Sequence, residues 1–100
     1  MADGYWISKT AERQLAEIID FTDQAFGVLQ TDAYIAGLKH SFELIAEFPG
    51  AGVAAFEIKQ GWRRHRFQSH YIFYSSQSGQ VLIEAIIHVR RNIRQDLFEA

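Results

Sequence analysis

Five polar side chains in the second half of the chain carry the chemical groups that RNA cleavage requires. The reaction needs a base for the 2′-hydroxyl, an acid for the leaving oxygen, and cations that stabilise the charge on the phosphate. His88, Tyr74, Arg63, Arg66 and Arg90 could supply all three from neighbouring strands. A net charge of −2 and a pI near 6.0 argue against this reading, because proteins that bind nucleic acid gain affinity from many basic contacts. RNA cleavage is therefore an alternative function and not the favoured one.

Several other chemistries lack their characteristic residues. The chain has no cysteine, which excludes disulfides, thiolate catalysis and cysteine-ligated zinc. The four histidines do not follow the spacing of familiar metal sites: His40, His65, His70 and His88. The sequence contains neither a glycine-rich phosphate loop nor a Gly-x-Ser-x-Gly motif. We therefore expect no metal and no cofactor.

Length and composition predict one globular domain over residues 1–100. Hydrophobic residues make up 48% of the chain and charged residues 22%, an ordinary balance for a folded protein. No stretch approaches the roughly 18 apolar residues that cross a bilayer. The first residues do not resemble the basic start of a secretory signal. The expectation is a cytoplasmic protein without membrane contact.

The first half of the chain predicts a short strand followed by two helices. Residues 4–8 are rich in β-formers, and Ser8 is a candidate N-cap for the next helix. The apolar face of that helix, which ends at Gly27, is formed by Ala11, Leu15, Ile18, Ile19, Thr22 and Phe26. A second helix is predicted over residues 29–47, because similar spacing continues until Pro49-Gly50 ends it. The two helices should form an antiparallel hairpin.

The second half predicts strands. Phe56 and Ile58 alternate with charged residues, which indicates extended backbone before a bend or bulge at Gln60-Gly61. Strands are predicted over residues 62–67, 70–74 and 81–88. The last of these is nearly all apolar and is therefore expected to be covered on both faces. The predicted fold class is α+β in the order β-α-α-β-β-β, with the N-terminal strand and the helical hairpin packed on a twisted, mainly antiparallel sheet.

The order of several short motifs resembles the ParE branch of the ParE/RelE toxin family. These motifs are Gly61-Trp62-Arg63-Arg64-His65-Arg66-Phe67, His70-Tyr71-Ile72-Phe73-Tyr74 and Ile86-Ile87-His88-Val89-Arg90-Arg91. The first half agrees, with an early serine, the Leu15-x-x-Ile18 helix, Gly27, and a helix that closes at Phe48-Pro49. Two positions depart from the family pattern: Gln68 stands where glycine is frequent, and His65 where an apolar residue is usual.

The resemblance implies the toxin of a type II toxin-antitoxin system, encoded beside a ParD-like antitoxin that wraps across it. For the ParE branch the implied target is DNA gyrase, which the toxin inhibits without being an enzyme itself. For the RelE branch the implied activity is cleavage of mRNA on the ribosome. Direct sequence-specific binding of nucleic acid is not expected. A toxin that keeps antitoxin binding but has lost toxicity is a third reading.

Arginine and aromatic side chains are the candidates for contacts with these partners, because both are enriched at interface hot spots. For the antitoxin these are Trp62, Arg64 and Phe73, and the broad apolar face of the second helix adds Ile35, Leu44 and Phe48. The candidates for the target are Arg90, Arg91 and Arg94, because six arginines fall within residues 61–100.

Each candidate also has a structural alternative. The aromatic residues can belong to the core, and His88 can be a hydrogen-bonded residue that fixes the segment after its strand. The arginines can be solvated or can pair with a helix carboxylate such as Glu43 or Glu47.

Overall fold

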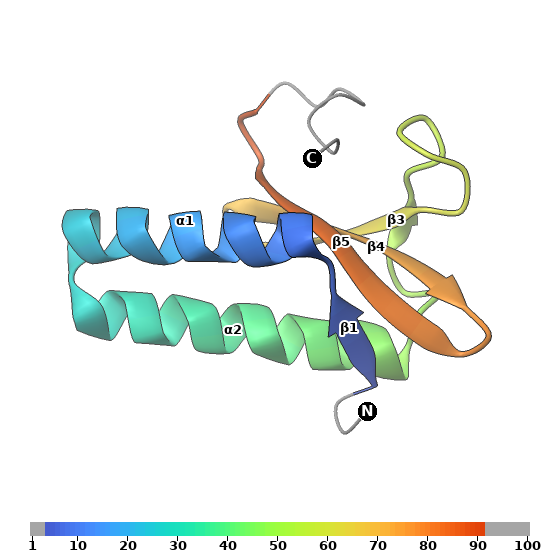
Figure 1. Cartoon of the computed structure of the whole chain (residues 1–100), viewed down its shortest axis with the longest axis horizontal. Coiled ribbons are helices and arrows are strands. Elements are labelled where there is room, and N and C mark those ends of the chain that lie inside the picture. The colour runs from blue at the N-terminus through green and yellow to red at the C-terminus, as the bar shows by residue number, and fades with distance from the viewer. Residues whose placement is uncertain (1–3, 92–100) are drawn as a thin grey trace.

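The computed structural model describes residues 4–91, which form seven helices and strands (Figure 1). In chain order they are β1 (Tyr5–Ile7), α1 (Lys9–Phe26), α2 (Val28–Glu47), β2 (Val53–Ala54), β3 (Arg63–Phe67), β4 (His70–Gln77) and β5 (Gln80–His88). The strands form one sheet in the order β1-β5-β4-β3-β2, in which β1 is parallel to β5 and the other neighbours are antiparallel. The predicted α+β fold is confirmed, and the two-residue strand β2 is an addition to it.

Ser8 begins α1 and also ties this helix to the sheet. Its hydroxyl accepts a hydrogen bond from the backbone N–H of Ala11 at 3.0 Å and donates one to the backbone oxygen of Glu84 at 2.8 Å. At the other end, Gly27 ends α1 with a φ of 88°, in the region that favours glycine. The predicted N-cap and glycine stop are therefore confirmed. Among residues 4–91, neither helix is long and apolar enough to cross a membrane.

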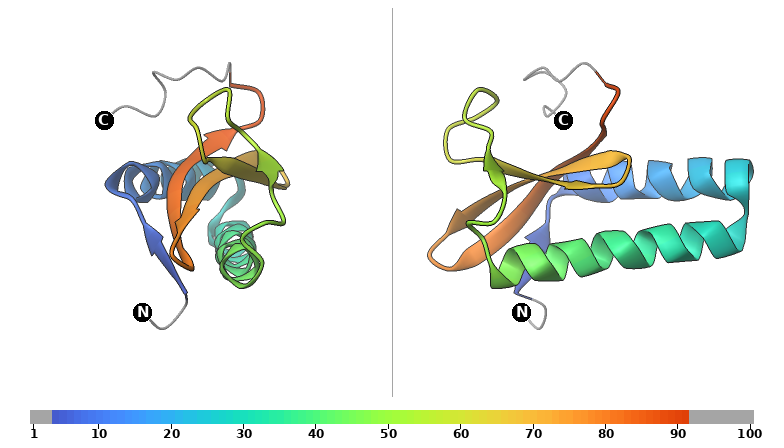
Figure 2. Two further views of the ribbon diagram at one scale, coloured as in Figure 1. Left: turned by 90° about the vertical axis from the view of Figure 1, so that its right-hand side faces the viewer. Right: turned by 180° about the vertical axis from the view of Figure 1, so that it is seen from behind.

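The helical hairpin covers one face of the sheet (Figure 2). The main core combines Ala11, Ile18, Leu38, Phe42 and Ile45 of the helices with Ile72, Tyr74, Val81, Ile83 and Ile86 of β4 and β5. The hairpin extends beyond the end of the sheet, so its connecting end stands clear of the strands (Figures 1 and 2). This explains why Phe26, predicted on the buried face of α1, is 66% exposed.

A second, smaller core lies on the other face of the sheet, beneath the loop of residues 55–62. Its buried residues are Ala55, Ile58, Trp62, Phe73, Ala85 and Ile87. The expectation of extended backbone over residues 56–59 is wrong, because the N–H groups of Ile58 and Trp62 donate to the carbonyls of Ala55 and Lys59 in turns, both at 3.0 Å. These turns bury Ile58 but leave Phe56 52% exposed. Among residues 4–91, this loop and not a helix covers that face of the sheet.

Strand β5 contains a bulge at the point where the element beside it changes from β1 to α1. Phe73 of β4 pairs with Ala85 and Tyr74 pairs with Ile83, so the backbone of the residue between, Glu84, is left out of the register, although its carboxylate accepts a hydrogen bond from the Ser75 hydroxyl at 2.7 Å. The β1 pairing of β5 reaches no further than Ile83. Beyond it, the buried side-chain oxygen of Gln14 accepts a hydrogen bond from the backbone N–H of Ile86 at 2.7 Å. A side chain of α1 thus takes the place of the missing strand.

Replacing Gln14 with leucine should lower the free energy of unfolding by about 2 kcal/mol, because the buried N–H of Ile86 would lose its acceptor. Leucine has a similar volume, so a cavity does not account for the loss. Urea denaturation followed by circular dichroism measures it. The matched control is Gln24→Leu at an exposed position of the same helix, which should change stability by no more than about 0.5 kcal/mol. Equal destabilisation by the two substitutions would contradict this role of Gln14.

Candidate functional site

Tyr74, a candidate acid or base for RNA cleavage, is a buried structural residue. Its side chain is fully buried, and its hydroxyl donates a hydrogen bond to the backbone oxygen of Pro49 at 2.7 Å. The same oxygen accepts a hydrogen bond from the N–H of Gly52 at 2.9 Å. Burial raises the pKa of Tyr74 above its ordinary value, so the phenol is neutral. Tyr74 therefore holds the segment between α2 and β2 against the sheet.

The arginines of β3 are divided between the two faces of the sheet, as their alternation predicts. Arg63 lies opposite Tyr74, and its Nη1 donates to the backbone oxygen of Gly52 at 2.8 Å. Arg64 points to the other face, with its guanidinium carbon 4.9 Å from the centre of the Tyr71 ring. Arg66 is exposed, and its Nε donates to the backbone oxygen of Gln68 at 2.8 Å. The three do not form one cationic patch.

The residues proposed for RNA cleavage are not brought together. His88 pairs with His70 at the start of β4, whereas Arg63 pairs with Tyr74, four residues further along the same strand. At the usual rise per residue, this separation is about 13 Å. A single phosphate could not contact both ends of this set. The geometry of the described residues therefore does not support the cleavage mechanism for these side chains.

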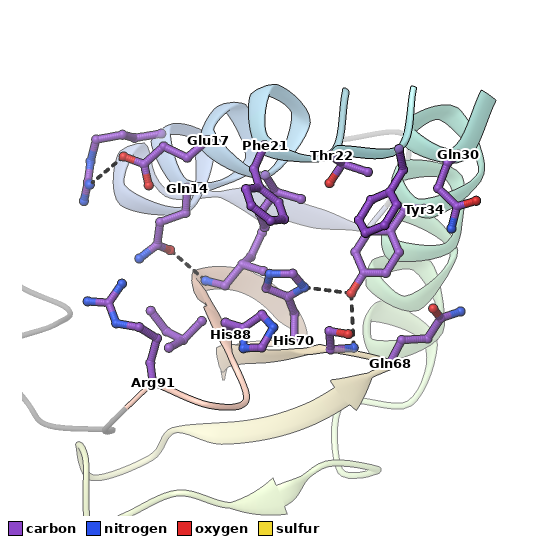
Figure 3. A pocket seen from close by; sticks show the side chains of 16 residues that line it. Gln14, Glu17, Phe21, Thr22, Gln30, Tyr34, Gln68, His70, His88 and Arg91 are labelled. Carbon is purple, nitrogen blue, oxygen red and sulfur yellow. Dashed lines mark hydrogen bonds and ion pairs between the residues drawn. The ribbon is translucent and has the colours of Figure 1, made fainter. Parts of the chain in front are cut away.

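A pocket of about 660 Å³ lies between the helical hairpin and the ends of β4 and β5 (Figure 3). Its lining combines aromatic side chains with hydrogen-bonding ones: Phe21, Phe26 and Tyr34 with Gln14, Gln30, Gln68, His70, His88 and Arg91. Glu17, the acidic residue among the lining side chains, lies 3.6 Å from Arg13 in an exposed ion pair. No spacing in the sequence predicts this pocket, because its walls come from both helices and two strands.

Tyr34, His70 and His88 form a chain of contacts in the pocket (Figure 3). The Tyr34 hydroxyl accepts a hydrogen bond from the N–H of Ser69 at 3.2 Å and lies 2.7 Å from Nδ1 of His70. The hydroxyl also donates to the backbone oxygen of Phe67 at 3.4 Å, so the direction of its bond with His70 depends on which imidazole nitrogen carries the proton. The rings of His70 and His88 meet edge to face, with centroids 5.2 Å apart. Burial, and secondarily the charge of His88, lower the pKa of His70 to about 4.

Stability should fall as the pH is lowered from 6.5 towards about 4, because of His70. In the unfolded chain this histidine has its ordinary pKa of 6.5, whereas in the folded protein it stays neutral down to about pH 4. Between these values the unfolded state binds more protons, so acid favours unfolding, and the stabilisation is fully present above pH 6.5. Denaturation midpoints measured from about pH 7 to about pH 5, above the range where most carboxylates titrate, test this.

The matched variant for the pH series is His70→Asn, because its amide oxygen can accept a hydrogen bond from the Tyr34 hydroxyl but does not titrate. We expect a shallower loss of stability in this variant than in the natural protein. Identical pH profiles for the two proteins would exclude His70 as the source of the effect.

Four of the residues predicted to bind the antitoxin contribute to the interior or its edge. Trp62 and Phe73 are buried in the second core, at 7% and 0% exposure. Ile35 is half-buried against the main core. Arg64 is half-buried over Tyr71. Trp62 and Phe73 therefore belong to the core, which was the alternative to a role in antitoxin binding, and they are not available at the surface.

The other two predicted antitoxin residues, Leu44 and Phe48, are exposed at 39% and 54%. Two more large apolar residues are exposed in the segment that follows α2, Val53 at 64% and Phe56 at 52%. The apolar spacing of the sequence does not single them out. We refer to these four residues as the α2-end patch. Because these four exposed apolar residues fall within 13 consecutive positions, they are candidates for contact with a partner.

The segment after β5 contains the residues predicted to contact the target. The backbone N–H of Arg90 donates to Nδ1 of His88 at 3.1 Å, and that of Arg91 donates to the His88 carbonyl at 2.9 Å. His88 therefore has the structural role that was its alternative, since it fixes the turn after the strand. Arg90 and Arg91 are exposed, and Arg94 lies outside the described residues.

Comparison with known proteins gives one consistent result. A family model described as the ParE toxin of type II toxin-antitoxin system, parDE, matches residues 5–93. Toxin ParE1 of Mycobacterium tuberculosis is 32% identical over 97% of this chain and 100% of its own length. Toxin ParE1 of Caulobacter vibrioides is 33% identical over 93% and 96%, and toxin ParE of Escherichia coli is 30% identical over 89% and 87%. Among solved structures, the chromosomal ParDE toxin-antitoxin system from P. aeruginosa matches with a TM-score of 0.76 and 12% identity, over 87% of this chain and 96% of that one.

Proposed function

Since the chain belongs to the ParE toxin family of type II toxin-antitoxin systems, we propose that it arrests growth by inhibiting DNA gyrase and is neutralised by a ParD-like antitoxin. The toxin acts by binding. Its partners are proteins, and it makes no sequence-specific contact with nucleic acid.

One observation supports this proposal: the side chains that could be reactive make structural hydrogen bonds to the backbone. Tyr74 and Arg63 hold the backbone of Gly52, and His88 fixes the turn at the opposite end of β4 and β5. Tyr74 and Arg63 are thus engaged at one end of β4 and His88 lies at the other, which does not suit joint action on one bound RNA. What the surface offers instead is exposed apolar side chains, which suit protein partners.

The α2-end patch is the proposed contact surface for the antitoxin. Its four side chains are large and apolar and are exposed by between 39% and 64% in the toxin alone. An amphipathic segment of an antitoxin could cover them with its apolar face. Arg64 is also proposed as an antitoxin contact, because its guanidinium group can pair with an acidic residue at the edge of that segment.

The proposal is tested with purified gyrase in supercoiling and DNA-cleavage assays, with and without the antitoxin. We expect the toxin to inhibit supercoiling or to stabilise cleaved DNA, and we expect the antitoxin to reverse the effect. Phe48→Asp should weaken antitoxin binding by at least about tenfold, because it places a charge within an apolar contact. Growth arrest without any effect on gyrase would refute the proposed target and favour mRNA cleavage on the ribosome.

A further inference from the structure

The connecting end of the helical hairpin carries four large apolar side chains that the fold does not bury. Phe21 is 68% exposed, Phe26 66%, Val28 63% and Leu29 86%. We refer to these four residues as the hairpin tip. The hairpin extends beyond the described strands at this end (Figure 1), although Phe21 and Phe26 also line the pocket next to β4 and β5. The tip is thus a second apolar surface, separate in sequence from the α2-end patch.

The hairpin tip is rigidly connected. Gly27 alone separates α1 from α2, and its N–H donates to the carbonyl of Asp23 at 3.0 Å. The carbonyl of Gly27 in turn accepts from the N–H and the hydroxyl of Thr31, at 3.1 and 2.9 Å. Binding through such a preformed end loses little conformational entropy. The geometry therefore suits a docking element.

The charge around the tip indicates what kind of surface it meets. Between Arg13 and Lys39 the sequence contains no basic residue, but it contains Glu17, Asp20, Asp23 and Asp32. All four of these acidic residues are exposed. They repel phosphate groups, which argues against DNA or RNA as the partner at this end. They attract a protein surface that carries lysine and arginine.

Helix stability does not account for two of these acidic residues. Asp20 and Asp23 lie in the last two turns of α1, where the carbonyl end of the helix dipole disfavours negative charge, and the last turn has no basic residue. Neither aspartate has a salt bridge among residues 4–91 within the 4.0 Å limit. Both carboxylates are therefore exposed and take part in no ion pair within residues 4–91, which leaves them available to a partner.

We propose that the hairpin tip is the surface by which this toxin contacts its target, and that the target presents an apolar depression rimmed by basic residues. This inference rests on the proposed function and specifies its contact site. The proposed antitoxin surface is distinct from the hairpin tip, because it lies at the other end of α2. Phe48 comes 19 positions after Leu29, which corresponds to roughly 28 Å along the helix. Each apolar surface then has its own partner.

The charge contribution is tested with Asp23→Asn. We expect its gyrase inhibition to weaken about fivefold at low salt and to depend less on salt than that of the natural toxin. We expect its melting temperature to rise by roughly 2 to 5 °C, because a charge opposed to the helix dipole is removed. A loss of activity together with a gain of stability separates a partner contact from a merely structural role.

The control is Glu12→Gln, which removes the same charge from the first turn of α1, where an acidic residue favours the helix. We expect it to lower the melting temperature slightly and to leave gyrase inhibition unchanged. Equal activity of the two variants would overturn the inference.

The apolar contribution is tested with Leu29→Ser, since Leu29 is the most exposed of the four tip residues. We expect gyrase inhibition to fall about tenfold or more, and antitoxin affinity to stay within about twofold of the natural value. Loss of antitoxin binding with full gyrase inhibition would overturn the inference and assign the tip to the antitoxin. If the natural toxin does not inhibit gyrase, the proposed target fails. The tip is then judged by whether Leu29→Ser, expressed as folded protein, relieves growth arrest, and unchanged arrest refutes it.

Discussion

Replacing Gly52 with alanine should lower the free energy of unfolding by about 3 kcal/mol. This is one of the two largest losses of stability expected among the single substitutions proposed for this protein. A methyl group at Gly52 would lie 2.7 Å from the backbone oxygen of Arg64 and 2.9 Å from Cε1 of Tyr74. The backbone oxygen cannot move without disturbing β3, and the Tyr74 ring is fully buried. The added methyl also displaces the Tyr74 hydroxyl, which accepts from the N–H of Gly52 and donates to Pro49.

The matched control for this prediction is Gly50→Ala, two residues earlier in the same connection. A methyl group there meets no atom within 4 Å, so stability should change by about 0.5 kcal/mol or less. Chemical denaturation of the two variants compares them directly. Tyr74→Phe, which removes only the hydroxyl, should cost about 2 kcal/mol and leave toxicity per folded molecule unchanged. Loss of toxicity without loss of stability would return Tyr74 to the list of catalytic candidates.

Replacing Gly37 with leucine should also destabilise the protein by about 3 kcal/mol, for a different reason. The Phe67 ring lies directly on the helix at Gly37, and an added Cβ would approach its Cζ atom most closely and its Cε1 atom at 2.8 Å. The ring also packs against Tyr34, with centroids 5.2 Å apart. Displacing Phe67 therefore disturbs Tyr34 and its hydrogen bond to His70 in the pocket.

A double-mutant cycle separates the clash at Gly37 from other effects. In the natural protein, Gly37→Ala should destabilise by about 1 to 2 kcal/mol, because the clash outweighs the better helix propensity of alanine. In a Phe67→Leu background, the same change should stabilise by up to about 1 kcal/mol, because the clash is removed and the propensity remains. Thermal or urea denaturation of the four proteins gives the coupling. The same sign in both backgrounds would show that Phe67 is not the constraint.

Much of the fold could be predicted because local chemistry determines it. Ser8 and Gly27 mark helix ends by interactions within a few residues, and the structure has both where they were expected. The positions of the hairpin, β3, β4 and β5 follow from apolar spacing. The loop over residues 55–62 could not be predicted in this way, because Ile58 and Trp62 are buried by turns that lead to the far face of the sheet.

The candidate site was less predictable because its residues depend on contacts between distant segments. Gln14 and Ile86 are 72 residues apart, and Tyr34 and His70 are 36 apart. Residue type alone suggested reactivity for Tyr74, yet its hydroxyl is enclosed by Pro49 and Gly52. Alternation correctly indicated that the three arginines of β3 cannot share one face. It could not indicate which backbone oxygens they bond.

The parallel pairing of β1 with β5 has a consequence for when the toxin becomes active during its own synthesis. Ser8 bonds to Glu84, 76 residues later, and within residues 4–91 β5 is the one strand that pairs with β1. The first strand and the start of α1 therefore cannot take their places until β5 has left the ribosome. Nascent chains that stop before Gln80 lack β5 altogether and should remain unfolded and harmless. The hazard to the cell begins with the completed chain, when an antitoxin already present can bind it as it folds.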